Sequence, residues 1–241
     1  MATITTLEYA LLSENVKKMN PVGRFRPDEF KYSTGFINNG FWGCIYVDDA
    51  AKQAVVAFKG TGNAKVDDDD VGSSRPNSTI IGDITADLKL AIGIIPNQAS
   101  TARKLFKRAK AAYDNYELSV VGHSLGGYLA QVVSYWYKAP CVTFNAPGAW
   151  GDLQKAKLNL FKPQVAWRSI KSTFSSDEVC NNFIHIGDPI GNYGLHRGRT
   201  NRLAGMGHGI KGIRKTIEGT RWRDICPFTV RDGAKGMWDR V

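Results

Sequence analysis

The sequence lacks any apolar run of the eighteen or more residues that a membrane span needs. Its first twenty residues also lack the basic start and apolar stretch of a Sec-type export signal. We therefore expect no transmembrane segment. The chain is expected to be cytoplasmic or to be exported by a secretion system that needs no such signal.

Metal-binding patterns are missing as well. The four cysteines are far apart and form no Cys-x-x-Cys pair, which argues against a zinc site and against a disulfide framework. We expect them to be reduced core thiols. Four consecutive aspartates at 67–70 lack the glycine-punctuated spacing of a calcium loop, so a solvated acidic loop is expected there. The sequence thus predicts no metal and no cofactor.

Acidic residues are few relative to basic ones, with 32 Lys and Arg against 22 Asp and Glu and a net charge of +10. Residues 191–241 hold eleven Lys and Arg against four Asp and Glu, which accounts for +7 of that total. Surplus lysine and arginine on a solvated face is the ordinary explanation. An anionic membrane surface is the alternative partner, and we expect no nucleic acid.

What is present is enough for a full core. A chain of 241 residues with 43% hydrophobic residues and no internal repeat predicts a single domain over 1–241. Strand-like and helix-like stretches alternate, which favours a mostly parallel sheet with helices on both faces. Residues 35–62 are expected to form two strands joined by a turn at Asp48-Asp49, the second of them over 54–58. Further strands are expected within 118–121, 141–150 and 182–191, and helices within 99–116 and 125–136.

One serine stands out in the pattern Gly122-His123-Ser124-Leu125-Gly126. A short β-branched run precedes it, and an apolar stripe at helical spacing follows it. A serine at a sharp strand-to-helix turn needs very small neighbours, because the strained backbone brings the flanking residues together. The context therefore favours Ser124 as a nucleophile over a turn serine.

A serine hydroxyl needs a base, normally an imidazole that a carboxylate holds in the right tautomer. The chain has four histidines. His123 adjoins Ser124 and His185 lies in a strand-like run, so both are expected to be structural. His196 and His208 lie in a glycine-dense segment that we expect to be a loop. His208 is preferred as the base because its small neighbours let the ring approach Ser124, and His196 remains the alternative.

The predicted acid is Asp188. It follows an apolar run and precedes a proline that ends the strand. Catalytic groups of open α/β sheets collect just past the carboxyl ends of strands. Asp177 is the reserve candidate, and a surface carboxylate is the alternative for both. The order Ser, Asp, His along the chain is that of α/β hydrolases.

The motifs "VVAFKGTG", "VVGHSLGGYLA", "TFNAPGA" and "HIGDPI" resemble, in this order, those of the class 3 lipases, and "FNAPG" resembles the bacterial phospholipase-like branch that includes secretion-system effectors. The similarity runs from about residue 35 to 210. It implies an α/β-hydrolase fold with Ser124 as nucleophile, Asp188 as orienting acid and His208 as base. Two departures are a lysine, Lys59, where arginine is usual, and a short gap between acid and base.

The resemblance also implies an oxyanion hole from the N–H groups of Thr61 and Leu125. It implies a lipase or A1-type phospholipase that acts on acyl lipids through an acyl-serine intermediate. The segment after Thr61, where the family carries a lid, is polar, which favours an esterase or thioesterase for soluble acyl substrates. Residues 88–96 are a candidate for acyl contact, with plain core as the alternative. An inactive fold used as a membrane-surface or protein-binding module is the third hypothesis, and the sequence identifies no secretion or immunity partner.

Overall fold

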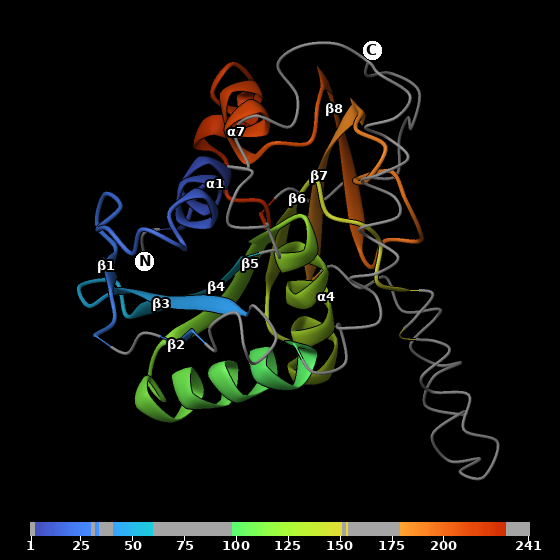
Figure 1. Ribbon diagram of the computed structural model, residues 1–241. Coiled ribbons are helices and arrows are strands. Elements are labelled where there is room, and N and C mark those ends of the chain that lie inside the picture. The colour runs from blue at the N-terminus through green and yellow to red at the C-terminus, as the bar shows by residue number, and fades with distance from the viewer. Residues whose placement is uncertain are drawn as a thin grey trace, which may run out of the picture.

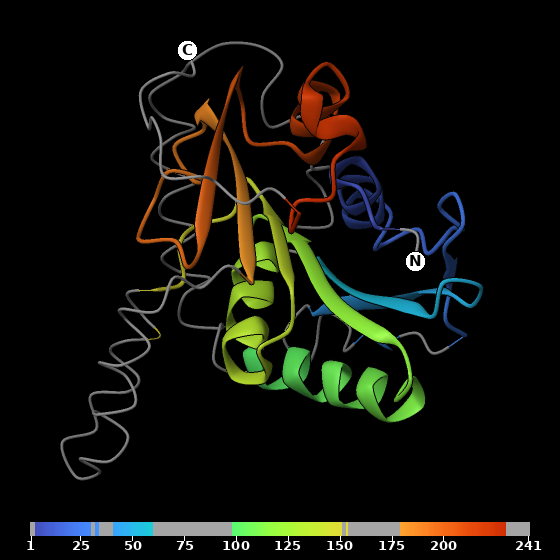
Figure 2. The ribbon, with the colours of Figure 1, turned by 180° about the vertical axis from the view of Figure 1, so that it is seen from behind.

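The computed structural model describes residues 3–29, 32–33, 41–59, 98–150, 153 and 179–229, and the account below concerns these residues. They form one eight-stranded sheet with helices on both faces, as Figure 1 and, from behind, Figure 2 show. This architecture confirms the predicted α/β-hydrolase fold, in which a mostly parallel sheet is covered on both sides.

The strands are β1 (Arg26–Pro27), β2 (Tyr32–Ser33), β3 (Trp42–Asp48), β4 (Gln53–Lys59), β5 (Glu117–His123), β6 (Cys141–Phe144), β7 (Cys180–Gly187) and β8 (Arg199–Met206). The helices are α1 (Thr6–Glu14), α4 (Leu125–Tyr137) and α7 (Ile210–Glu218), with a helical stretch over 98–112 and a 3₁₀ turn η1 (Arg221–Asp224). The described core strands match the expected ones. β8, α1 and α7 were not predicted.

The strand order is β1-β3-β4-β5-β6-β7-β8, and β2 also pairs with β3. β3 and β4 are antiparallel, whereas every pair from β4 to β8 is parallel. The carboxyl ends of β4 to β8 therefore meet at one edge of the sheet. Ligand and catalytic sites of open α/β sheets form at this edge.

One face of the sheet is covered by α4 and the helix over 98–112. Their buried apolar residues include Ala102, Leu105, Phe106, Ala109, Leu129 and Val133. The predicted apolar stripes are thus largely confirmed, with two exceptions. Ala112, the last residue of its helix, is exposed. Trp136 is 52% exposed, and the Arg103 guanidinium lies over its ring, 4.7 Å from the ring centroid.

The other face is covered by α1, α7 and η1. Here the first and last described segments meet, since the backbone N–H and the hydroxyl of Thr6 both donate to the Ile225 carbonyl oxygen at 2.9 Å. α7 presents three buried isoleucines to the sheet at helical spacing, Ile210, Ile213 and Ile217.

The expectation that the glycine-dense segment around His196 and His208 is a loop was wrong in part. Residues 199–206 form β8, which pairs with β7 and with no other described strand. Of its residues only Leu203 is buried, so the strand lacks the apolar alternation that marks a strand in the sequence. His208 consequently lies in a short turn between β8 and α7.

No helix within the described ranges is long and apolar enough to cross a membrane. All four cysteines are free thiols. Cys44, Cys141 and Cys180 are buried, and Cys226 is half-buried. Burial raises the pKa of the Cys44 thiol to about 12, and it raises the pKa of Cys141 as well. Such thiols stay protonated and unreactive at neutral pH.

Candidate active site

Ser124 lies at the turn between β5 and α4, in a backbone conformation with φ 55° and ψ −130°. A non-glycine residue with positive φ is strained by roughly 1–3 kcal/mol. The turn also requires its glycines. A Cβ on Gly122 would lie 2.3 Å from the carbonyl of Gly126, and a Cβ on Gly126 would lie 2.1 Å from the Phe58 carbonyl oxygen. The predicted strand, turn and helix around Ser124 are therefore present.

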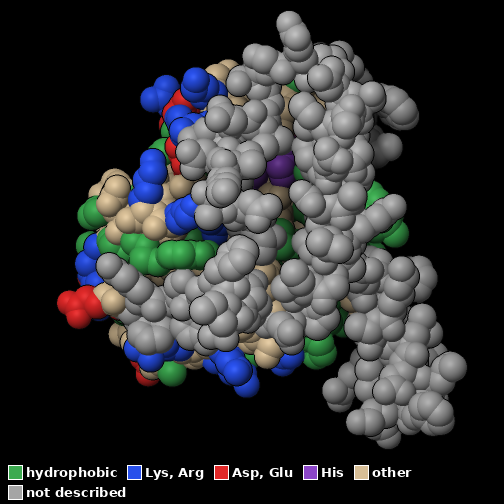
Figure 3. All heavy atoms as spheres, in the orientation of Figure 1, with side chains coloured by type: hydrophobic (Ala, Val, Ile, Leu, Met, Phe, Trp, Pro, Cys, Tyr) green, Lys and Arg blue, Asp and Glu red, His purple; other side chains and the backbone are tan. Residues whose placement is uncertain are grey.

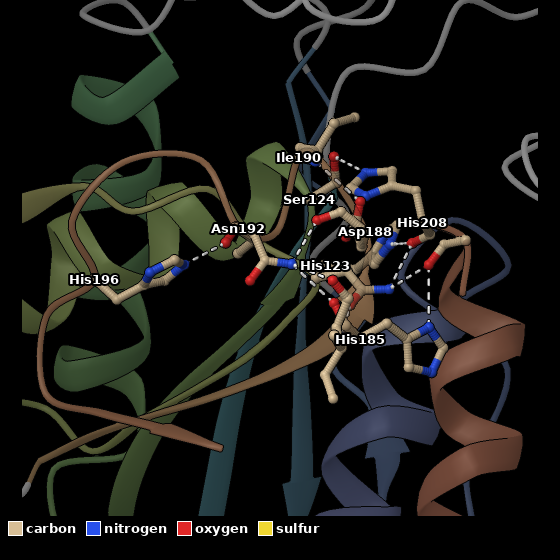
Figure 4. A network of polar contacts seen from close by, with 12 residues as sticks. His123, Ser124, His185, Asp188, Ile190, Asn192, His196 and His208 are labelled. Atoms are coloured by element: carbon tan, nitrogen blue, oxygen red, sulfur yellow. Dashed lines mark hydrogen bonds and ion pairs between the residues drawn. The ribbon is translucent and has the colours of Figure 1, made fainter. Parts of the chain in front are cut away.

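The side chain of Ser124 does not cap α4 but contacts a histidine. His208 Nε2 lies 2.7 Å from Ser124 Oγ, and His208 Nδ1 lies 2.9 Å from Asp188 Oδ2. Figure 4 shows the three side chains pointing toward one another. They come from the carboxyl ends of β5, β7 and β8, which lie along the same edge of the sheet. The structure thus brings together the three residues that the sequence singled out.

Asp188 is fully buried. Its Oδ2 faces His208, and its Oδ1 accepts a hydrogen bond from the Ile190 N–H at 3.0 Å. Asn192 Nδ2 reaches the carbonyl oxygens of His185, Ile186 and Asp188, which closes the end of β7 around the carboxylate. A buried carboxylate with both oxygens engaged can hold an imidazole in one tautomer, with the proton on Nδ1.

The backbone beside His208 is held by side chains from three other elements. Asn145 Nδ2 lies 3.2 Å from the Gly207 carbonyl oxygen and 3.0 Å from that of His208. His123 Nε2 contacts the His208 oxygen at 2.6 Å, and His185 Nδ1 contacts the Gly207 oxygen at 3.0 Å. His123 and His185 are thus packed residues, as predicted. Asn145 was not predicted from the sequence, although it is a polar residue just past a buried strand, which is the signal that identified Asp188.

The other candidates lie elsewhere. His196 Nε2 contacts the Ala146 carbonyl oxygen at 2.8 Å, and its ring lies apart from Ser124 in Figure 4. Burial lowers the pKa of His196 below its ordinary value of 6.5. Asp177 and Thr61 are outside the described residues, as are 67–70 and 88–96. Leu125 is the first residue of α4, and the first N–H groups of a helix have no partner within it.

Parts of the site are exposed at the surface. Ser124 is half-buried, the His208 side chain is 13% exposed, and histidine atoms reach the surface in Figure 3. Two apolar side chains flank the edge of the sheet beside it, Ile186 at 63% and Met206 at 82% exposure. Within the described ranges, no group of three or more His, Cys, Asp or Glu side chains is arranged to hold a metal ion.

The basic surplus near the site is partly neutralised. In Figure 3 basic side chains gather over the α7 end of the molecule with acidic side chains among them. Arg214 Nε lies 2.6 Å from Glu14 Oε2, and Arg214 also pairs with Glu218. Arg214 therefore joins α7 to α1, and its charge is already paired within the molecule.

Comparison with known proteins gives relatives that are named as lipases. The chain is similar to two proteins named "Putative lipase ATG15". The one from Candida glabrata is 26% identical over 184 residues, covering 60% of this chain and 35% of that protein. The one from Vanderwaltozyma polyspora is 27% identical over 185 residues, covering 65% of this chain and 31% of that protein. The chain thus spans about a third of the length of these curated relatives.

Among solved structures, a triacylglycerol lipase from Penicillium expansum superposes with a TM-score of 0.49 at 16% identity, over 84% of this chain and 79% of that one. The assignment of the fold rests on the sheet order and the strand directions given above. The family model described as "Phospholipase-like: Tle-like phospholipase domain" matches residues 25–160, more than half of the 241 residues. The chain belongs to this family of lipase-like and phospholipase-like α/β hydrolases.

Proposed function

We propose that the protein is a serine carboxylic ester hydrolase that acts on acyl lipids, as an A1-type phospholipase or a lipase, through an acyl-serine intermediate. The observation that carries the proposal is the continuous chain of hydrogen bonds from Ser124 Oγ through His208 to Asp188. Both distances fall within the range that proton transfer and imidazole orientation require.

In the proposed reaction, Ser124 Oγ attacks the acyl carbonyl carbon while His208 Nε2 takes the hydroxyl proton. Asp188 holds the other proton on Nδ1 and stabilises the imidazolium that forms. The tetrahedral intermediate collapses when the ester C–O bond breaks and His208 returns the proton to the leaving alcohol oxygen. A water molecule, activated by the same imidazole, then releases the fatty acid and restores the serine.

We propose that the backbone N–H groups of Leu125 and Thr61 form the oxyanion hole. Leu125 directly follows Ser124 at the N-terminus of α4, where unpaired N–H groups and the helix dipole favour negative charge. Removing one donor from such a hole raises the barrier by roughly 3–4 kcal/mol. For Thr61 the proposal rests on the resemblance to the class 3 lipases alone.

The proposed substrate is an acyl lipid, and its support comes from two sources. The family is phospholipase-like, and the relatives named above are called lipases. Ile186 and Met206 are exposed at paired strand ends, two residues before Asp188 and His208 respectively, where they would contact an acyl chain or a lipid surface. Exposed apolar patches on otherwise folded surfaces mark contact sites.

The test is Ser124→Ala with a short-chain nitrophenyl ester and a fluorophosphonate probe. We expect turnover to fall by a thousandfold or more, on the order seen when a triad serine is removed, with thermal stability nearly unchanged. The wild type should be labelled at Ser124. Wild-type protein that neither reacts with the probe nor turns over any ester would support the third hypothesis, an inactive fold used for binding.

A second experiment separates membrane lipid from soluble acyl substrates. Because the basic surplus of 191–241 is expected to attract an anionic surface, hydrolysis in anionic vesicles should exceed that in neutral ones at low salt. Since salt screens charge over roughly a Debye length, the difference should shrink as salt rises. Equal rates on both vesicles, together with fast turnover of a soluble acyl thioester, would favour the esterase or thioesterase hypothesis.

A further inference from the structure

The carbonyl groups of Gly207 and His208 belong to the turn that carries the proposed base. They follow β8 and precede α7, whose N-cap is Gly209, so both come before Gly209, whose oxygen accepts hydrogen bonds from the N–H groups of Gly212 and Ile213. Gly207 has φ 86°, a conformation that glycine adopts without steric cost. A glycine also restricts the backbone of the turn less than any other residue would. The turn that carries the proposed base therefore needs support from outside.

Asn145 supplies a large part of that support. It follows β6, is fully buried, and its single amide nitrogen Nδ2 is within hydrogen-bond distance of both carbonyl oxygens, at 3.2 Å to Gly207 and 3.0 Å to His208. His123 Nε2 is a second donor to the His208 oxygen at 2.6 Å. Two side chains from neighbouring strand ends thus hold one backbone carbonyl of the base.

The orientation of the Asn145 amide is determined by its other contacts. Oδ1 accepts a hydrogen bond from the His185 N–H at 2.9 Å, so Nδ2 must point the opposite way, toward the His208 turn. The Asn145 N–H donates to the Phe183 carbonyl oxygen at 2.9 Å. Asn145 thereby joins the ends of β6 and β7 to the turn that follows β8.

Asn145 also has a left-handed backbone, with φ 44°. Asparagine adopts this conformation more readily than most residues, but glycine adopts it with no steric cost. If the turn after β6 were the only requirement at this position, glycine would serve at least as well. The carboxamide is the part of Asn145 that glycine lacks, and all of its described contacts go to β7 and to the His208 turn.

We infer that Asn145 is a positioning residue for His208, assisted by His123, and this inference rests on the proposed function. Asn145 fixes the backbone of the turn so that one imidazole reaches Asp188 and Ser124 together. A misplacement of about 1 Å at a reacting group costs on the order of a hundredfold in rate. A shift of this turn would lengthen both hydrogen bonds of His208 at once.

The experiment compares Asn145→Gly with Lys138→Gly. Lys138 is the C-cap of α4 and has φ 57°, so both substitutions relieve a left-handed backbone, but only the first removes a contact with the His208 turn. We expect kcat on a nitrophenyl ester to fall about 10- to 100-fold in Asn145→Gly with KM changed less than about twofold. Lys138→Gly should keep the wild-type kcat.

A second readout does not depend on activity. A proton on His208 Nδ1 shared with Asp188 gives a far-downfield NMR signal, which is assigned by its loss in Asp188→Asn. This signal should be lost or broadened in Asn145→Gly and kept in Lys138→Gly. If the wild type hydrolyses no ester, the proposed function fails, while the NMR comparison still decides whether Asn145 positions His208.

A second variant distinguishes a loss of positioning from a folding defect. Asn145→Asp keeps the Oδ1 acceptor for the His185 N–H but places a carboxylate oxygen against the two carbonyl oxygens, so it should lose at least as much kcat and the same NMR signal. If Asn145→Gly matches Lys138→Gly in both readouts, the inference is overturned and Asn145 is only a turn residue. Failure of both Asn145 variants to fold would overturn it too, because the residue would then serve folding.

Discussion

The two faces of the sheet are built in different ways. On one face, the helix over 98–112 comes shortly before β5 in the chain and α4 directly after it, and both helices bury apolar residues at helical spacing. On the other face, α1, α7 and η1 come from the two ends of the described chain and meet through contacts such as Thr6 to Ile225. The first face depends on short-range sequence patterns, and the second depends on pairing across most of the chain.

The proposed site draws on both faces. Ser124 begins α4, whereas His208 comes just before α7. Asp188 follows β7, which lies between β5 and β8 in the sheet. The hydrogen-bond chain therefore requires that the terminal segments dock on the sheet. Substitutions that disturb the packing of either face should therefore lower the activity, but through different residues of the site.

The largest expected effect distinguishes His208 from His196, the two candidates for the base that the sequence left open. His208→Ala should reduce ester turnover nearly as much as Ser124→Ala, by a thousandfold or more, because residues of a triad act as a unit. His196→Ala should keep most of the activity, since His196 contacts the Ala146 carbonyl oxygen instead. Turnover of a nitrophenyl ester by both variants is the measurement. The reverse ranking would move the proposed base to His196.

A glycine on each face tests how tightly the two faces are packed. In Gly126→Ala the new Cβ would lie 2.1 Å from the Phe58 carbonyl oxygen in β4, so the start of α4 must move. We expect a loss of about 3 kcal/mol in the free energy of unfolding, together with loss of activity. Denaturant unfolding measures the first quantity, and ester turnover measures the second.

The matched change on the other face is Gly212→Ala in α7. Its Cβ would meet only the His185 ring at 3.8 Å, which is ordinary contact, and alanine favours a helix over glycine. We expect a gain of about 0.5 kcal/mol in unfolding free energy with activity retained. Equal destabilisation by Gly126→Ala and Gly212→Ala would contradict a difference in packing between the two faces.

The α4 face could be predicted because each of its signals is local. The β-branched run before Gly122, the two glycines and the apolar stripe after Ser124 lie within about twenty residues. The α7 face could not be predicted as well. Ile210, Ile213 and Ile217 have helical spacing, but the glycines around them suggested a loop, and α1 buries its residues only against distant segments.

The same division applies to the site. Ser124, Asp188 and His208 each sit where a strand ends, and the parallel order of strands brings these ends together. The position of Asn145 just past a buried strand was visible in the sequence, but its contacts with the His208 turn were not, because a hydrogen bond between a side chain and a backbone carbonyl about sixty positions away leaves no pattern in the sequence.

The last prediction tests the docking of α7 on α1. Arg214 bridges Glu14 and Glu218, and its side chain is 18% exposed and that of Glu14 16%. Arg214→Ala leaves Glu14 without this partner, so we expect a loss of about 1 kcal/mol in the free energy of unfolding, which lowers Tm by about 2–4 °C in a chain of this size.

Arg223→Ala is the control, because it removes the same charge from a 60% exposed side chain whose carboxylate neighbour is 3.7 Å away. Because His208 precedes α7, the temperature at which activity is lost should fall with Tm in Arg214→Ala and stay unchanged in Arg223→Ala. Equal shifts in the two variants would mean that charge alone, and not the contact between the terminal helices, sets the stability of this face.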